Sequence, residues 1–246
     1  MWLGLGIKIV NWLRSVGPSG PFGGHATLAD DLVSYWKLDE VSGVRYDAVV
    51  ASANDLTDNN TVTSATGVRD LAAEFTAANS EWLSRASGNT ALDNTFTVSM
   101  WLNVGATTRF GVLHNGSGVG TYGFAVECSV FAAGDLFVVH RDDGGDFSYT
   151  AGGVVTTDNS AYQLVIFTYD TATTPKLHVY VNDVDKALTL GVAFPVLGIG
   201  SASLLGRRSD TPRFFTGKQD EVGIWSRVLT AQERTDLYNG GAGLFY

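Results

Sequence analysis

The chain has 246 residues, of which 45% are hydrophobic, and it carries a formal net charge of -9. This acidic balance disfavours nucleic acid as a partner, because phosphate backbones attract clustered Lys and Arg, and it is compatible with neutral sugars or calcium. Only 17% of residues are charged and 29 are glycine, which is typical of a turn-rich β protein, and all-β domains of this length often form one unit. The single cysteine, Cys128, excludes a disulfide within the chain and is expected to be a small buried hydrophobe in a strand.

Residues 1–16 form an apolar arm. The segment is too short and too interrupted to span a bilayer, and it lacks the basic start and cleavage site of a signal peptide. A helix would place most of its large apolar side chains on one stripe. The anchoring residues expected in this arm are Trp2, Leu5, Ile9, Trp12 and Leu13. The Gly- and Pro-rich residues 17–25 are expected to be a linker, so we divide the chain into an anchoring arm and linker, 1–27, and one domain, 28–246.

The apolar side chains of residues 1–24 need a hydrophobic partner. One interpretation is docking onto other proteins of an assembly, or onto another copy of the chain. A second is insertion at a membrane surface. A third is packing back onto the chain's own domain, which the linker disfavours without excluding it.

From Leu28 onward the sequence changes to short runs with the alternation of β-strands. The expected strands are 33–38, 72–75, 82–85, 96–103, 109–115, 122–128, 135–141, 163–169, 176–181, 201–206 and 214–225. In the fourth of these, Phe96, Val98, Met100 and Leu102 point one way and the residues between them point the other way. Turn-forming residues separate the runs about every 8–12 residues, which indicates an antiparallel β-sandwich or barrel.

One helix is expected near the C-terminus. Thr230 and Glu233 form a capping box, in which the Thr hydroxyl and the Glu carboxylate each accept a hydrogen bond from a free backbone amide. The helix is expected to run to about Tyr238 and to stop at residues 239–241, Asn-Gly-Gly.

Three stretches of the body resemble laminin G-like jelly-roll domains of the concanavalin A-like lectin/glucanase superfamily, of the type found in bacterial and phage surface proteins. The first is LVSYWKLDEVSG at 32–43, with Asp47 and 54–57 after it. The second is FTVSMWL at 96–102, with 167–170 and 177–182. The third is 205–207 and 215–230, ending at 237–241. Together they follow the family's order across residues 28–246, with Gln219 in place of the usual aliphatic residue as a departure.

The resemblance implies an all-β fold, a jelly roll of two antiparallel sheets with six or seven strands each, packed face to face. A short C-terminal helix and the N-terminal apolar arm complete the expected architecture. The resemblance also implies that the first and last body strands pair. Trp36 and Trp225 are then core residues rather than platforms for a sugar.

The family often holds a structural calcium ion at one end of the sandwich, and calcium takes six to eight oxygen ligands. The expected ligands are Asp39, Asp47 and Asp220, with turn oxygens near Ser42 and Gly43. The alternative is that Asp39 and Asp220 cap turns or pair with arginines such as Arg45 or Arg227.

Retaining glucanases of this superfamily carry a Glu-x-Asp-x-Glu-type run, because their chemistry needs two carboxyl groups about 5–5.5 Å apart. That run is absent. Glu127 sits alone, and strand alternation would point Asp220 and Glu221 to opposite faces. The four histidines show no metal-site spacing, and there is no nucleophile elbow and no phosphate loop. We therefore expect a protein that is not an enzyme.

Sugar binding needs exposed aromatic rings beside polar side chains. The candidates on loops or outward positions are Tyr122, Arg141, Phe147, Tyr149 and Trp101. We expect a surface, decoration or attachment protein, at a virion surface or outside the cell. It would be displayed on a particle such as a phage virion through residues 1–24 and would adhere to glycans or cell surfaces. The alternatives are a free secreted carbohydrate-binding module and, less favoured, a glycoside hydrolase; fold analogy alone does not decide among them.

Overall fold

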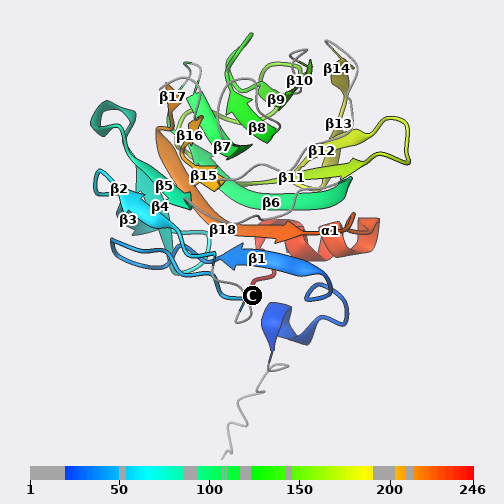
Figure 1. Ribbon diagram of the computed structural model, residues 1–246, viewed down its shortest axis with the longest axis horizontal. Coiled ribbons are helices and arrows are strands. Elements are labelled where there is room, and N and C mark those ends of the chain that lie inside the picture. The colour runs from blue at the N-terminus through cyan, green and yellow to red at the C-terminus, as the bar shows by residue number, and fades with distance from the viewer. Residues whose placement is uncertain are drawn as a thin grey trace, which may run out of the picture.

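The computed structural model describes residues 20–49, 54–85, 94–106, 108, 110–116, 123–141, 146–190, 203–208 and 213–246. Two eight-stranded antiparallel sheets pack face to face, and one α-helix lies against the outside of the first sheet (Figure 1). This arrangement confirms the expected β-sandwich, although each sheet has eight strands rather than the expected six or seven. Within these ranges, no helix is long and apolar enough to cross a lipid bilayer.

Sheet 1 contains the first and last long strands of the body. In spatial order its strands are β13 (Val184–Lys186), β12 (Leu177–Val181), β11 (Gln163–Asp170), β6 (Thr95–Val104), β18 (Gly217–Trp225), β4 (Leu71–Phe75) and β3 (Thr63–Thr66). Strand β1 (Leu32–Trp36) also pairs with β18, along the half of β18 that β4 leaves free.

Sheet 2 forms the upper layer in Figure 1. Its order is β14 (Leu188–Leu190), β10 (Asp146–Thr150), β9 (Leu136–Arg141), β8 (Gly123–Cys128), β7 (Phe110–Gly116), β15 (Ser203–Leu205), β5 (Trp82–Arg85) and β2 (Thr57–Asn59). A separate two-stranded hairpin pairs β16 (Arg207–Arg208) with β17 (Arg213–Phe214). The helical segments are η1 (Pro21–Gly24), η2 (Ala77–Asn79), α1 (Ala231–Tyr238) and η3 (Asn239–Gly241).

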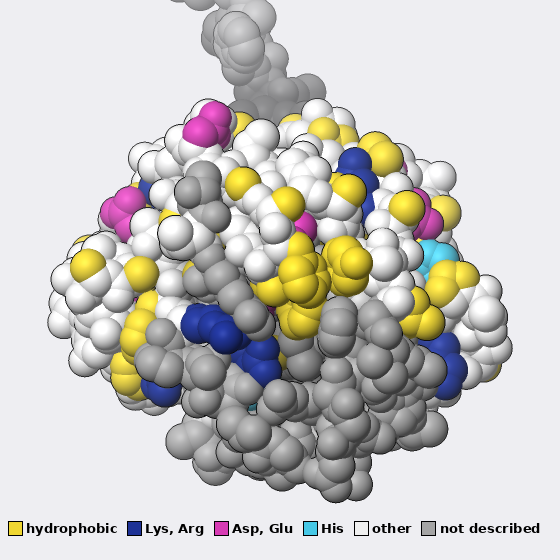
Figure 2. Space-filling model, turned by 90° about the horizontal axis from the view of Figure 1, so that it is seen from above, with side chains coloured by type: hydrophobic (Ala, Val, Ile, Leu, Met, Phe, Trp, Pro, Cys, Tyr) yellow, Lys and Arg dark blue, Asp and Glu magenta, His cyan; other side chains and the backbone are white. Residues whose placement is uncertain are grey.

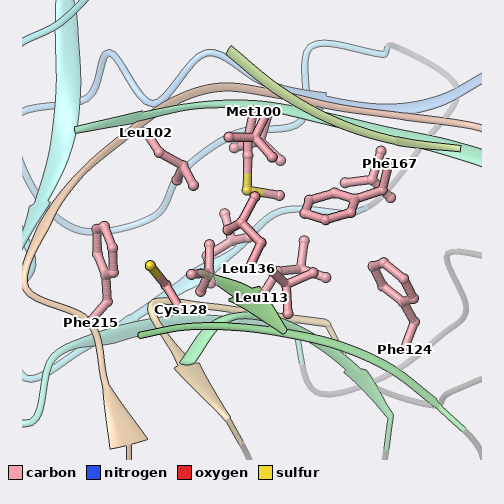
Figure 3. Close-up of a cluster of buried hydrophobic side chains, with 14 of the residues drawn as sticks. Met100, Leu102, Leu113, Phe124, Cys128, Leu136, Phe167 and Phe215 are labelled. Atoms are coloured by element: carbon pink, nitrogen blue, oxygen red, sulfur yellow. The ribbon is translucent and has the colours of Figure 1, made fainter. Parts of the chain in front are cut away.

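The main core lies between the two sheets. The residues of β6 that point into it are Phe96, Val98, Met100 and Leu102, as their alternation predicts. Figure 3 shows Met100 reaching from sheet 1 toward Leu136 of sheet 2, with Cys128 beside them. Burial raises the pKa of the Cys128 thiol to about 12, so the thiolate is not populated near neutral pH. Cys128 is therefore a packing residue, which confirms the expectation.

The outer face of sheet 1 is buried as well. Trp101 on β6 and Trp225 on β18 belong to a second apolar cluster, which includes Leu237 of α1. The ring of Trp101 stacks on Tyr238 at a centroid distance of 6.2 Å. Strand β1 pairs with β18 and Trp36 is 1% exposed, so the expected strand pairing and the core positions of Trp36 and Trp225 are confirmed.

Helix α1 begins with the expected capping box. The Thr230 hydroxyl accepts from the Glu233 amide at 3.2 Å, and the Glu233 carboxylate accepts from the Thr230 amide at 2.8 Å. The helix ends at Asn239, which adopts a left-handed conformation. The Glu233 carboxylate also accepts from Arg227 at 2.7 and 2.8 Å and from the Thr27 hydroxyl at 2.5 Å. One carboxylate thus joins the helix to the segment before β1.

Packed structure begins before the domain boundary expected at residues 27 and 28. Phe22 is 1% exposed, and its ring contacts those of Tyr35 and Tyr246 at centroid distances of 5.3 and 5.5 Å. His25 Nε2 lies 3.0 Å from Asp236 Oδ2 on α1. These contacts fasten the start of the described chain to the outer face of sheet 1.

The segment expected to be a linker, 17–25, is therefore part of the body from Gly20 onward. Glycines and prolines made it resemble a linker, but the single aromatic ring of Phe22 fills the second apolar cluster. All five anchoring residues expected in the arm lie outside the described residues.

The expected strands all correspond to strands of the structure, with shifts at their ends. The expected strands do not include β2, β3, β10, β13, β14 and β16. The runs TDN and TSAT of β2 and β3 are polar and are exposed or half-buried, so they show no apolar alternation. These short outer strands form because longer neighbours offer them hydrogen bonds, which a local pattern does not reveal.

Glu233→Gln tests the carboxylate that joins helix and N-terminal segment. Hydrogen bonds from Arg227, above all, lower the pKa of Glu233 to about 2. A lowered pKa stabilises the fold above pH 4.5, and this stabilisation is lost as the pH falls toward 2. We expect the variant to lower the free energy of unfolding at pH 7 by about 1–3 kcal/mol in denaturant titrations. Its stability should also change less than that of the native chain between pH 5 and pH 2.

The exposed Gln232→Ala on the same helix is the control and should change stability by less than about 0.5 kcal/mol. Equal stability of Glu233→Gln and the native chain at pH 7 would contradict the proposed role of this carboxylate.

Candidate ligand-binding face

The outer face of sheet 2 carries a row of side chains at one register. Glu127 on β8 pairs with Phe137 on β9, which pairs with Tyr149 on β10. Residues directly opposite one another share a face, so these three lie side by side. Phe131, in the turn between β8 and β9, lies over them at centroid distances of 5.5 Å from Phe137 and 4.6 Å from Tyr149. We call Phe131, Phe137 and Tyr149 the aromatic cluster.

A buried carboxylate holds the turn that carries Phe131. Asp135 is 1% exposed and accepts hydrogen bonds from the amides of Val130, Phe131 and Ala132 at 2.8, 2.7 and 2.9 Å. Phe131 itself is 60% exposed. An exposed ring on a backbone fixed in this way loses little conformational entropy when it contacts a ligand.

Two arginines lie next to the aromatic cluster. Arg208 donates to Glu127 Oε1, and Arg213 Nη1 lies 2.9 Å from Glu127 Oε2. Gly111 allows the β16–β17 hairpin to pack onto β7, because a Cβ there would lie 2.3 Å from the Arg208 amide nitrogen. Glu127, which has no glucanase-type run of acids around it in the sequence, is 0% exposed and bound by two guanidinium groups.

A second aromatic group lies against a third arginine, Arg207. The Arg207 guanidinium carbon lies 4.7 Å from the centroid of the Trp82 ring and 5.3 Å from that of Phe214. Seen from above, hydrophobic side chains lie beside Lys and Arg side chains on this side of the molecule (Figure 2). Aromatic rings and basic groups thus gather on one face of a chain whose net charge is -9.

The sugar-binding candidates divide into three groups. Tyr149 belongs to the aromatic cluster. Arg141 and Phe147 lie in β9 and β10 beside it, although the structure does not describe their side chains, and Tyr122 lies outside the described residues. Trp101 is 3% exposed beneath α1, so its selection as an exposed aromatic was wrong.

The sequence analysis missed Phe131, Trp82 and Phe214. A large apolar residue between two turn-forming segments, as in S-V-F-A-A-G-D, was the available signal for Phe131. The Trp82 and Phe214 rings lie 5.8 Å apart between centroids, although the two residues are more than a hundred positions apart along the chain. No local pattern predicts that contact.

The carboxylates expected to bind calcium do not form one group of ligands. Asp47 Oδ1 accepts from the amides of Tyr35 and Val49 at 3.0 and 2.9 Å, at the edge of β1. The Gly43 carbonyl accepts from Arg45 at 2.7 Å. Ser42 is exposed.

The remaining two expected ligands accept hydrogen bonds from amides at or just before the start of β4. Asp39 Oδ1 accepts from the Leu71 amide at 3.0 Å, and Asp220 Oδ2 accepts from the Val68 amide at 2.7 Å. Across the described ranges, no three His, Cys, Asp or Glu side chains are arranged to hold a metal ion. The five positions therefore do not fit one calcium site, and calcium binding stays a prediction.

Asp220 and Glu221 form a buried acidic pair. The register of β18 shifts after Asp220, and Glu221 has a φ of 49°, so strand alternation is broken there. The two carboxyl groups consequently interact, and the expectation that they point to opposite faces was wrong. Burial, and then the charge of Glu221, raises the pKa of Asp220 to about 8. Burial also raises the pKa of Glu221 to about 7, against a hydrogen bond with Tyr35 that lowers it.

A family model described as the concanavalin A-like lectin/glucanases superfamily matches residues 75–233. The chain belongs to this superfamily. A search of curated protein sequences gave no match.

Solved structures similar to this superfamily member include both binding domains and enzymes. The binding domain of Paraclostridial Mosquitocidal Protein 1 has a TM-score of 0.64 and 14% identity, over 86% of this chain and 52% of that one. Domain 4 of the arabinanase AbnA from Geobacillus stearothermophilus, in complex with arabinotriose, has a TM-score of 0.61 and 18% identity, over 84% of this chain and 97% of that domain. A Trypanosoma rangeli sialidase has a TM-score of 0.61 and 14% identity, over 87% of this chain and 33% of the sialidase. The chain thus spans about half of the toxin domain and a third of the sialidase.

Membership of a superfamily that contains both lectins and glucanases leaves the chemistry to be argued from the site. The exposed fractions of the whole residues are 0% for Glu127, 0% for Asp220 and 2% for Glu221. Arginines bind the first, and the other two are buried in sheet 1. None of the three presents a carboxyl group to a polysaccharide in this structure.

Asp220→Asn tests the buried acidic pair. A carboxyl whose pKa is raised on folding stabilises the fold most at low pH, and this stabilisation is lost as the pH rises from about 4 through the folded pKa of about 8. In chelator, the melting temperature of the native chain should therefore fall by roughly 5 °C between pH 5 and pH 8. The variant should show a smaller fall.

Asp70→Asn is the matched control, because the Asp70 side chain is 71% exposed, and its pH dependence should follow the native chain. Parallel curves for Asp220→Asn and the native chain would contradict the raised pKa.

Repeating the melts in millimolar calcium tests the calcium prediction. A bound ion would raise the melting temperature of the native chain but not that of Asp220→Asn.

Proposed function

We propose that the chain is a non-enzymatic carbohydrate-binding module whose ligand lies on the outer face of sheet 2. The observation that carries this proposal is the position of Phe131, exposed above Tyr149 on a turn held by Asp135. Aromatic rings offer a flat apolar surface for the CH groups of a sugar ring, and nearby polar groups set its orientation. Arg213 and Arg207 supply donors beside the two aromatic groups.

The comparisons support this proposal in general terms. The chain is a lectin-like domain by family, and the similar arabinanase domain was solved in complex with arabinotriose. The burial of Glu127, Asp220 and Glu221 favours binding over hydrolysis.

Phe131→Ala should weaken glycan binding about tenfold or more, because the ring supplies most of the exposed aromatic surface of the cluster. The measurement is glycan-array binding, followed by calorimetry with the best oligosaccharide, with arabinotriose included as a probe. Val41→Ala is the control, since Val41 is 70% exposed and lies outside the aromatic cluster. The proposal fails if Phe131→Ala binds as the native chain does, or if no glycan binds the native chain.

A second proposal is that residues 1–19 display the module on a particle such as a phage virion, at a virion surface or outside the cell. Phe22 fixes the start of the described chain on the outer face of sheet 1, and the aromatic cluster lies on the outer face of sheet 2. These faces lie on opposite sides of the molecule (Figure 1). An anchor before Gly20 would leave the aromatic cluster facing away from the particle. A membrane surface is the alternative anchor.

Deleting residues 1–19 tests display while it preserves Phe22. We expect the native chain to sediment with a large particle from its source, and the deletion to remain in the supernatant with its glycan binding unchanged. Co-sedimentation with lipid vesicles instead of a particle would favour the membrane surface. Two soluble monomers of equal behaviour would contradict both forms of anchoring.

A further inference from the structure

A pocket of about 360 Å³ opens at one edge of the sandwich, where β10 and β14 of sheet 2 meet β12 of sheet 1. Leu177, Leu188, Leu190 and Pro175 give it a mainly apolar wall. Its volume falls in the range of small-molecule sites, about 300–1,000 Å³. Leu190 is 58% exposed, so an apolar side chain stands in contact with solvent beside this pocket.

One polar side chain in this wall lacks a partner. Ser148 on β10 is 1% exposed, and its Oγ forms no hydrogen bond within the described part of the chain. Two residues further along the same strand, the Thr150 hydroxyl accepts from the Leu136 amide at 2.8 Å and donates to the Ala151 carbonyl at 3.1 Å. A buried hydroxyl without a partner costs free energy, and a ligand atom that bonded to it would remove that cost.

The chemistry of the wall restricts the ligand. Thr174 and Lys176 are the other polar residues of the lining. A sugar would still place several hydroxyl groups against the leucines without partners. We infer that the pocket binds a small, mainly apolar molecule with a single hydroxyl that bonds to Ser148. This site is separate from the glycan-binding face, so either proposal can fail without the other.

The probe is 2-naphthol, with naphthalene as the matched molecule that lacks the hydroxyl, and the measurement is the dissociation constant by calorimetry on the full chain. We expect Ser148→Ala to weaken 2-naphthol about tenfold and to change naphthalene by less than about twofold. Leu190→Arg should abolish binding of both. Val184→Arg is its control, because Val184 is 56% exposed and does not line the pocket, and it should bind both probes as the native chain does.

The inference is overturned if the native chain binds neither probe, or if Leu190→Arg binds both unchanged. It is also overturned if binding appears only after the apolar residues 191–200, which follow Leu190 directly, are replaced by Gly and Ser. That result would mean that the chain's own apolar segment fills the pocket. Thermal melts of all variants verify that each one folds.

Discussion

The structure depends on one constraint, which is that the two central strands of sheet 1 are apolar on both faces. β6 and β18 bury Met100 and Val222 toward sheet 2, and Trp101 and Trp225 on the opposite side. A strand with two apolar faces needs a cover on each, and a sandwich provides only one. The two ends of the described chain supply the other cover. Helix α1, the C-terminal residues and the segment around Phe22 all pack onto this outer face.

The outer face of sheet 2, in contrast, has no helical cover among the described residues. It carries the aromatic cluster, the three arginines of the β16–β17 hairpin and Trp82, and no helix of the described chain packs over them. Two buried carboxylates hold parts of this face in place. Asp135 fixes the turn of Phe131, and Glu127 fixes the guanidinium groups of Arg208 and Arg213. Rigid support of this kind is what a recognition surface requires.

The sequence was sufficient for features that local physics determines. The alternation of β6 and the capping box of α1 follow from spacings of two and three residues, and the burial of Cys128 follows from its residue type. All three are confirmed. The core positions of Trp36 and Trp225 followed from the family resemblance. The candidate site was harder, because its parts meet only in three dimensions. In the sequence Phe131 resembles an ordinary loop residue, because the hydrogen bond between its amide and Asp135 is visible only in the fold.

Departures from simple alternation account for the other differences. The irregularity at Glu221 brings two carboxyl groups together that a regular strand would separate. Phe22 turns an apparent linker into part of the body. The acids expected to converge instead hold backbone amides at different places, Asp47 at β1 and Asp39 at β4. A backbone irregularity in the first case, and tertiary contacts in the other two, outweigh the local pattern.

The contact between Phe22 and Tyr246 places both ends of the described chain next to each other. A polypeptide joined before Gly20 and another joined after Tyr246 would leave from the same side of the sandwich. Such a unit can be inserted into a longer chain or repeated in tandem, and no connecting segment would have to pass over the aromatic cluster. Copies attached to one support through these ends would all direct the aromatic cluster away from the support. Weak individual contacts would then add up through avidity, which is the regime in which a shallow aromatic surface can hold a multivalent target.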